Sequence, residues 1–433
     1  PFKVSIGDGN TKNTEKPQVD EAQAQVTFRE STWYLREEFK QDFLLESKDL
    51  DFIEERKSFK LTSSNSTEVG VIIDATLLAR RTSANRYLCT ASFVNRSSKD
   101  KASSTLYQTS VAIKALNGSE FIPYPEARRD FEMDVDDESA LLLYRKHPTF
   151  AIGHNIGVDW DRETGLSTDK LRLTPMPVFE APSITPSIEF KNGTEAQIDM
   201  RIQASLAKKN EAISTLATLV NEYEGWISDR VIEAKNDSLI QASFARSADL
   251  NLSECTLALK RMKAGLELLQ QDKDVYEAYR LANEAMLSQQ YHSRLPERKV
   301  TFNGRVSVPE PYPSHAIPDT GGKWRPFQIA FILSVLESVA NPKSEDRDLV
   351  DLIFFPTGGG KTEAYLGVSA FTILLRRIRD PKNSGTVVLM RYTLRLLTTQ
   401  QFIRAASLLC ALEMIRLEDT DRTLATAEVF LEL

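Results

Sequence analysis

The ten residues 354–363, Phe-Phe-Pro-Thr-Gly-Gly-Gly-Lys-Thr-Glu, constrain this chain more than any other stretch. The largely apolar run 349–355 leads into them and predicts a buried strand, and an apolar series typical of a helix begins at Ala364. Strand, glycine loop and helix in this order are the context that a phosphate-binding loop requires. Successive glycines let backbone N–H groups curl around a polyphosphate, and a helix N-terminus adds positive partial charge. The stretch therefore predicts a nucleotide site.

The residue types of the loop predict individual roles. Lys361 is expected to reach the β- and γ-phosphates and the Thr362 hydroxyl to sit on Mg²⁺, which makes both catalytic as well as cofactor-binding residues. Five further residues are expected to line the nucleotide: Thr357, Gly358, Gly359, Gly360 and Glu363. The strict pattern asks for a glycine where Phe355 stands, and the remaining residues resemble the looser motif I of superfamily 2 helicases and translocases. ATP and Mg²⁺ are the predicted cofactors; an ordinary glycine-rich turn is the alternative.

A second element lies about thirty residues earlier, where residues 324–328 read Trp-Arg-Pro-Phe-Gln. They resemble the Arg-Pro-x-Gln element that many superfamily 2 enzymes place ahead of motif I. In those enzymes a glutamine amide pairs with the adenine edge, so Gln328 is the expected adenine reader and Arg325 its companion in the cofactor site. The alternative is a solvated glutamine at a helix start.

A third element follows the loop and its helix. Residues 385–390 predict the next buried strand, and residues 391–401 after it resemble motif Ia, which touches the nucleic-acid backbone. Five side chains there supply donors suited to phosphate oxygens: Arg391, Thr393, Arg395, Thr398 and Gln400. A basic, solvated helix start is an equally good interpretation. The order of elements predicts half of a RecA-like doubly wound domain.

The sequence after Lys361 holds no apolar strand that ends in Asp-Glu. Motif II, which holds Mg²⁺ and activates water, and the second RecA lobe are therefore expected to lie outside the sequence given. Because charge neutralisation in phosphoryl transfer needs both, this part alone is expected to bind ATP and hydrolyse it poorly.

Length and pattern predict a multidomain α+β and α/β chain of 433 residues. Residues 1–65 are predicted to be a polar lead-in with short helices, and period-two alternation predicts a β-rich domain over 66–190. Apolar stripes at helical spacing predict a helical bundle domain over 194–295, and proline and glycine mark a linker over 296–322. Residues 323–433 are the expected partial RecA-like lobe with its parallel sheet. The acidic run at 134–138 is expected to be a solvated turn, with a carboxylate metal site as the alternative.

Composition limits the expected location of the protein and its binding partners. No apolar run approaches 18 residues, so no membrane span is expected. Three cysteines without metal-ligand or disulfide spacing fit a reducing cytoplasm. The formal net charge is −7, so any contact with phosphates is expected to be local rather than driven by bulk charge.

Several motifs resemble the N-terminal part of the large helicase subunit of DISARM-type bacterial anti-phage systems. They are Leu143-Tyr144-Arg145, residues 150–154 and 174–177, the helix with Tyr223 and Trp226-Ile227, and residues 282–286 and 354–367. The resemblance covers about residues 130–433 in motifs. It implies a superfamily 2 helicase-type ATPase that engages DNA, single-stranded or at a duplex end, and works with a second defence-system subunit. The predicted function is thus an ATP-dependent DNA helicase or translocase in anti-phage defence. The rival is a nucleotide-gated DNA- or partner-binding module that moves no strand.

Overall fold

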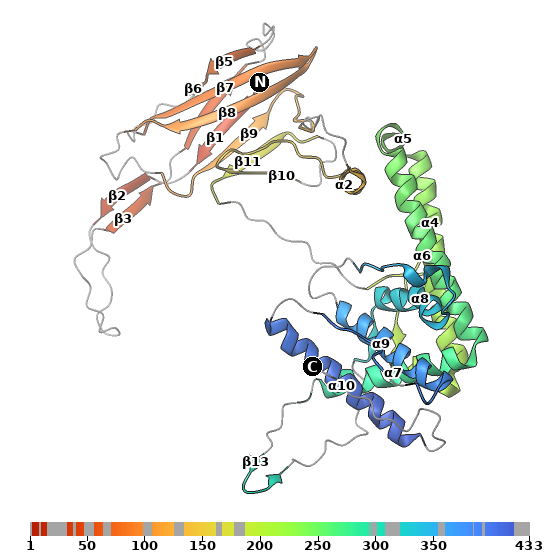
Figure 1. The fold of residues 1–433 in the computed structure, drawn as a ribbon. Coiled ribbons are helices and arrows are strands. Elements are labelled where there is room, and N and C mark those ends of the chain that lie inside the picture. Colours follow the sequence, from red (N-terminus) through yellow and green to blue (C-terminus); the bar gives the residue numbers. More distant parts are fainter. Residues whose placement is uncertain are drawn as a thin grey trace. The chain divides into compact units, whose positions relative to one another are not determined.

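The structure is a computed structural model, and it describes residues 2–7, 10–14, 33–37, 40–46, 56–63, 71–97, 106–124, 134–161, 167–176, 187–293, 295, 301–307, 321–353, 360–383, 385–391 and 395–419. The chain is of mixed α and β composition and forms two compact units, Pro1–Ala181 and Pro182–Leu433. Figure 1 shows the strands of the first unit and the helices of the second.

Unit 1 is built from antiparallel strands. Its larger sheet has the order β10 (Gly157–Trp160), β11 (Lys170–Thr174), β9 (Ser110–Ala115), β1 (Phe2–Gly7), β4 (Lys40–Leu45) and β6 (Thr62–Ser63). A second sheet has the order β5 (Arg56–Lys60), β7 (Ile73–Ser83) and β8 (Arg86–Asn95), and β2 (Asn10–Thr14) pairs with β3 (Trp33–Glu37). Phe43 and Leu45 of the first sheet and Leu77 of the second are buried in one cluster. The two sheets therefore share a core, as in a β-sandwich.

The expectation of short helices within residues 1–65 is wrong for the described part of that stretch. β1 pairs with both β4 and β9, and β4 buries Gln41, Phe43 and Leu45 at period two. Pairing across the sheet decided the conformation, because local spacing over a few residues is a weak signal.

The acidic run at 134–138 is also not a turn. It opens α2 (Val135–Leu143), where the Asp134 carboxylate caps the helix by accepting from the N–H groups of Asp136 and Asp137 at 2.7 and 2.9 Å. Carboxylates in the first helical turn are favoured by the helix dipole, which explains why acidic residues gather there.

Unit 2 is mainly helical. Its helices are α3 (Met200–Gln203), α4 (Lys209–Asn236), α5 (Ser238–Ser243), α6 (Ala245–Gln271), α7 (Lys273–His292), α8 (Pro326–Ala340), α9 (Lys361–Arg379) and α10 (Arg395–Glu418), with 3₁₀ turns η3 (Leu206–Lys208) and η4 (Glu345–Asp348). Two-residue strands form the pairs β12 (Ile198–Asp199) with β15 (Lys323–Trp324) and β13 (Thr301–Phe302) with β14 (Val306–Ser307). The helices predicted within 194–295 are confirmed by α4, α6 and α7.

The segments 194–295 and 323–433, predicted as two domains on either side of a linker, pack on one hydrophobic core. The buried Trp324 indole N–H donates to Asn283 Oδ1 of α7 at 2.6 Å. At Gly265 of α6, a Cβ atom would lie 2.0 Å from the carbonyl oxygen of Leu333 in α8, so these two helices touch backbone to backbone. Sequence spacing could not reveal this contact, because it depends on where the two helices cross.

A parallel sheet is not formed in the described part of the chain. Residues 349–353 and 385–390, which the sequence predicts as part of one buried strand and as the next, form no strand, and Val350, Leu352 and Leu389 are 95%, 84% and 79% exposed. An apolar segment becomes a buried strand only when neighbours pair with its N–H and C=O groups and cover both faces. Residues 354–355 lie outside the described residues.

Candidate nucleotide-binding site

The N-terminus of α9 is the centre of the candidate site. Gly360 precedes the helix in the left-handed conformation, with φ of +88°. A Cβ atom at this position would lie 2.8 Å from Gln328 Nε2 and 3.3 Å from Arg325 Nη1. The left-handed backbone favours glycine here, and a larger residue would also displace the Gln328 amide. Among the described residues, the Gly360 position supplies no side-chain cap to α9, and the start of this 19-residue helix is suited to bind an anion.

Gln328 fastens α8 to the end of the glycine loop. Its side chain is buried, Oε1 accepts from the Arg325 N–H at 2.8 Å, and Nε2 donates to the Gly360 carbonyl at 2.7 Å. The amide thus holds Arg325 and Gly360 on either side of itself, which brings three of the predicted cofactor residues together. Both amide atoms already make one bond within the chain, and the adenine role of Gln328 stays a prediction.

Glu363 lies in the first turn of α9, and its side chain is close to Gly360. Its Oε1 accepts from Arg404 Nη2 of α10 at 2.6 Å, and its Oε2 lies 3.5 Å from the position of a Gly360 Cβ. Oε2 is buried and has no hydrogen-bond partner in the described part of the chain. A buried carboxylate oxygen without donors is costly, so this atom is suited to bind water or a hydrated cation beside the loop.

Lys361 and Thr362 occupy the first turn of α9, and both are half-buried. The described residues fit a nucleotide with Mg²⁺ in three respects. A helix N-terminus favours an anion, Arg325 and Lys361 add positive charge, and the orphaned Glu363 oxygen suits the water shell of a hard cation. Lys361 and Arg325 would hold the phosphates and Thr362 would hold Mg²⁺.

Other predicted site residues are placed less fully. Thr357, Gly358, Gly359 and Thr393 lie outside the described residues. Arg391 is exposed in the segment before α10, and Gln400 is exposed in the first turns of that helix. Arg395 and Thr398 belong to α10, but their side chains lie outside the description. The nucleic-acid role of these residues stays a prediction.

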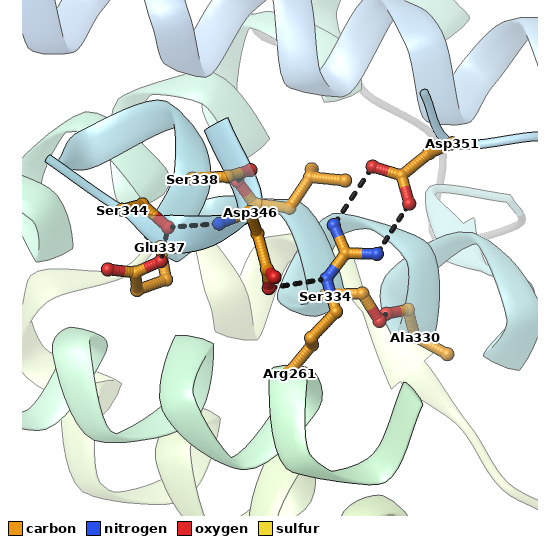
Figure 2. A network of polar contacts seen from close by, with 9 residues as sticks. Arg261, Ala330, Ser334, Glu337, Ser338, Ser344, Asp346 and Asp351 are labelled. Atoms are coloured by element: carbon orange, nitrogen blue, oxygen red, sulfur yellow. Dashed lines mark hydrogen bonds and ion pairs between the residues drawn. The ribbon is translucent and has the colours of Figure 1, made fainter. Parts of the chain in front are cut away.

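A polar network, shown in Figure 2, anchors the segment that leads into the loop. Arg261 of α6 makes a two-pronged contact with Asp351, from Nη1 and Nη2 at 2.5 and 2.9 Å, and its Nε lies 3.1 Å from Asp346 Oδ2. Its side chain is only 11% exposed. Ser344 accepts from the Asp346 N–H and bonds to Glu337, which fixes η4 at the end of α8. Helix α6 therefore holds residues 346–351, which precede the glycine loop, in place.

Arg261 and Arg404 are the two residues of the site that the sequence did not reveal. Their partners are 90 and 41 positions away along the chain, and neither arginine belongs to a recognisable motif. Among the residues that the structure describes, no group of His, Cys, Asp and Glu could hold a metal by itself, and no helix is long and apolar enough to cross a membrane.

Comparison with known proteins gives one informative match. No protein-family model matches the chain. The DISARM protein DrmA of Bacillus paralicheniformis is 28% identical over 397 residues, which make up 88% of this chain. The chain spans 33% of the length of that relative. The DISARM resemblance predicted from the motifs is thereby confirmed as a likeness: the chain is similar in sequence to DrmA along most of its length.

Proposed function

We propose that this chain is the N-terminal part of an ATP-dependent DNA helicase or translocase subunit in bacterial anti-phage defence. The observation that carries the proposal is the cluster of Arg325, Gln328, Gly360 and Glu363 around the uncapped start of α9. The likeness to a DISARM protein supports the defence role. The second defence-system subunit belongs to this proposal, as does DNA as the partner.

The residues of the site divide the work as follows. The first N–H groups of α9, with Lys361 and Arg325, bind and orient the phosphates, and Thr362 holds Mg²⁺. Gln328 keeps the loop end in place and presents its amide near the base. When bound, ATP supplies the phosphoryl bond whose hydrolysis drives movement along the strand. Arg391 and Gln400 would position the DNA backbone without reading its sequence.

The proposal includes a RecA-like doubly wound sheet. Residues 349–353 and 385–390 carry exposed apolar side chains, among them Val350, Leu352 and Leu389, which neighbouring strands of such a sheet would cover. Motif II and the second lobe would complete the catalytic machinery, because hydrolysis needs carboxylates on Mg²⁺ and an arginine on the transition-state charge. ATP would close the two lobes around the strand, and hydrolysis would release them.

The test is ATP hydrolysis by the whole gene product, with and without DNA. Lys361→Ala is expected to abolish DNA-stimulated turnover, and Lys382→Ala, an exposed lysine just beyond the end of α9, is the matched control that keeps it. ATP binding without any DNA-dependent turnover in the wild type would contradict the motor and favour the nucleotide-gated module. Equal turnover in the wild type and Lys361→Ala would contradict the assignment of the site.

A further inference from the structure

The solvent-facing side of the β5–β7–β8 sheet in unit 1 collects arginines. In β7, every second residue from Ala75 to Ala79 is buried in the core, so Arg80 belongs to the opposite, exposed face. Arg56 of β5 is directly opposite Arg80, and Leu88 of β8 is opposite Arg80 on the other side. Arg86 stands two positions before Leu88, so it lies on the same face and diagonal to Arg80. On this face, three neighbouring strands therefore each contribute one exposed arginine at the same end of the sheet.

This arrangement is unfavourable for the sheet by itself. Like charges directly opposite each other destabilise a strand pair, and Arg56 and Arg80 form such a pair. Within the described part of the chain, no ion pair involves Arg56, Arg80 or Arg86. The other end of the same face differs, because Asp74 lies between Lys60 and Arg96 at 4.0 and 3.1 Å. The charges at one end of the face thus neutralise each other, whereas an external anion would relieve the repulsion between the arginines at the other end.

The sequence of the two longer strands reinforces this charge. Residues 73–95 carry three arginines and one acidic residue, Asp74 at the other end of the face, although the whole chain has 61 acidic residues and a net charge of −7. Hydroxyl side chains lie on the same face, among them Thr90 and Ser92, and they are further donors for phosphate oxygens. The acidic residues that precede β5, Glu54 and Glu55, lie outside the described residues.

We propose that this face, defined by Arg56, Arg80 and Arg86, binds the sugar–phosphate backbone of a nucleic acid. All three cations are arginines, whose planar guanidinium group pairs with phosphate oxygens in a two-pronged way. A nucleic acid offers phosphates in a row, as the three strands offer arginines in a row. A membrane surface is a poorer match, because the aromatic residues nearby, Phe59 and Tyr87, belong to the opposite face of the sheet. Binding here does not require the nucleotide site, which belongs to the other unit.

The experiment measures binding of a labelled single strand and a labelled duplex to the full chain, by fluorescence anisotropy over a series of salt concentrations. The test variant is Arg56→Gln/Arg80→Gln/Arg86→Gln. The control is Lys235→Gln/Lys260→Gln/Lys273→Gln, which removes the same charge from exposed positions on three helices. If the three arginines contact phosphates, the slope of log K against log salt falls by about 2 for a single strand and nearly 3 for a duplex. The affinity at about 0.1 M salt then falls roughly 100-fold.

The lysine control variant is expected to keep the wild-type slope. Should the triple variant lose its circular-dichroism spectrum, Arg80→Gln alone is measured, with an expected slope change of about 0.7 to 0.9. The proposal is overturned if the arginine and lysine variants lose the same affinity, because the effect is then bulk charge. It is equally overturned if the arginine variant binds nucleic acid normally and instead loses binding to phosphatidylserine vesicles or to an acidic protein.

Discussion

Replacing Arg261 by methionine is expected to loosen the segment that leads into the glycine loop. Methionine keeps most of the aliphatic stem of the side chain, so the substitution removes mainly the guanidinium group. Asp351 and Asp346 would then lose their shared cation (Figure 2). The two carboxylates, which are 28% and 30% exposed in the structure, would be left without the charge that now lies between them. The segment 349–353 would lose its described polar anchor to α6.

The size of the effect follows from burial. Breaking a buried ion pair by removing one partner costs about 3–5 kcal/mol, whereas exposed pairs contribute about 0–1 kcal/mol. Arg261 is nearly buried at 11% exposure, but its partners are about a third exposed and are screened by water. We therefore expect unit 2 to lose about 2 kcal/mol, which for a unit of this size lowers Tm by about 4–8 °C.

The measurement is thermal unfolding of the full chain, followed by circular dichroism of the helices. The control is Lys263→Met, which removes a cation two residues along α6 whose partner Glu224 is exposed, and which should cost less than about 1 kcal/mol. The Asp351 hydrogen bonds raise the pKa of the Arg261 guanidinium against the opposing effect of burial. Because a raised pKa leaves the stabilisation complete below the ordinary pKa of arginine, the penalty should not change between about pH 6 and pH 9.

A double-mutant cycle with Asp351→Asn isolates the pair itself. If the contact of Figure 2 carries the effect, Arg261→Met costs at least about 0.5 kcal/mol less in the Asp351→Asn background than in the wild type. An equal cost in both backgrounds would refute the reasoning, because the loss would then come from packing of the stem. A cost no larger than that of Lys263→Met would refute it as well.

Two further predictions concern the packing of each unit. Gly265→Ala should destabilise unit 2 by about 2 kcal/mol or more, since its Cβ would lie 2.0 Å from the Leu333 carbonyl oxygen. The control is Gly225→Ala in α4, where a Cβ would lie 3.6 Å from Lys191; thermal unfolding should show it to be neutral or slightly stabilising. In unit 1, burial raises the pKa of the Cys89 thiol from 9.0 to about 11. Because only the thiolate reacts and its fraction falls about 100-fold, alkylation of Cys89 at pH 8 should be about 100-fold slower than that of an exposed thiol such as Cys410. Equal alkylation rates for Cys89 and Cys410 would contradict this prediction. The folding stability that comes from the raised pKa of Cys89 is complete below pH 9 and is lost as the pH rises towards 11.

Helical periodicity was the most reliable signal in this sequence. The apolar stripes of residues 209–292 predicted helices that the structure confirms, because one turn of spacing repeats many times over helices of 20 to 28 residues. The strands of residues 2–63 could not be predicted in the same way. Each is two to six residues long, too short for a period to stand out, and its partner is far away in the sequence.

In the candidate site, too, local patterns could be predicted and long-range contacts could not. The start of a helix after the glycine loop was readable, since three glycines and Lys-Thr form a local pattern, and α9 begins at Lys361. Bringing Gln328 onto the Gly360 carbonyl was beyond sequence reasoning, because it depends on how α8 and α9 pack. The same holds for Arg404, whose contact with Glu363 arises only when α10 lies beside α9.

Helices α6 and α7 position residues of the candidate site, although they supply no residue that would contact the nucleotide. In a doubly wound domain, a sheet fixes the helix starts that face the ligand. Here α6 touches α8 backbone to backbone at Gly265, and Asn283 of α7 holds Trp324 just before Arg325. Arg261 of α6 adds the anchor on the segment that enters the loop. Since α8 carries Gln328 and this segment leads to Gly360, a shift of α6 by a fraction of a turn would separate the two residues whose hydrogen bond closes the site. The position of Gly360 is therefore set by the packing of α6 and α8 as well as by the local sequence.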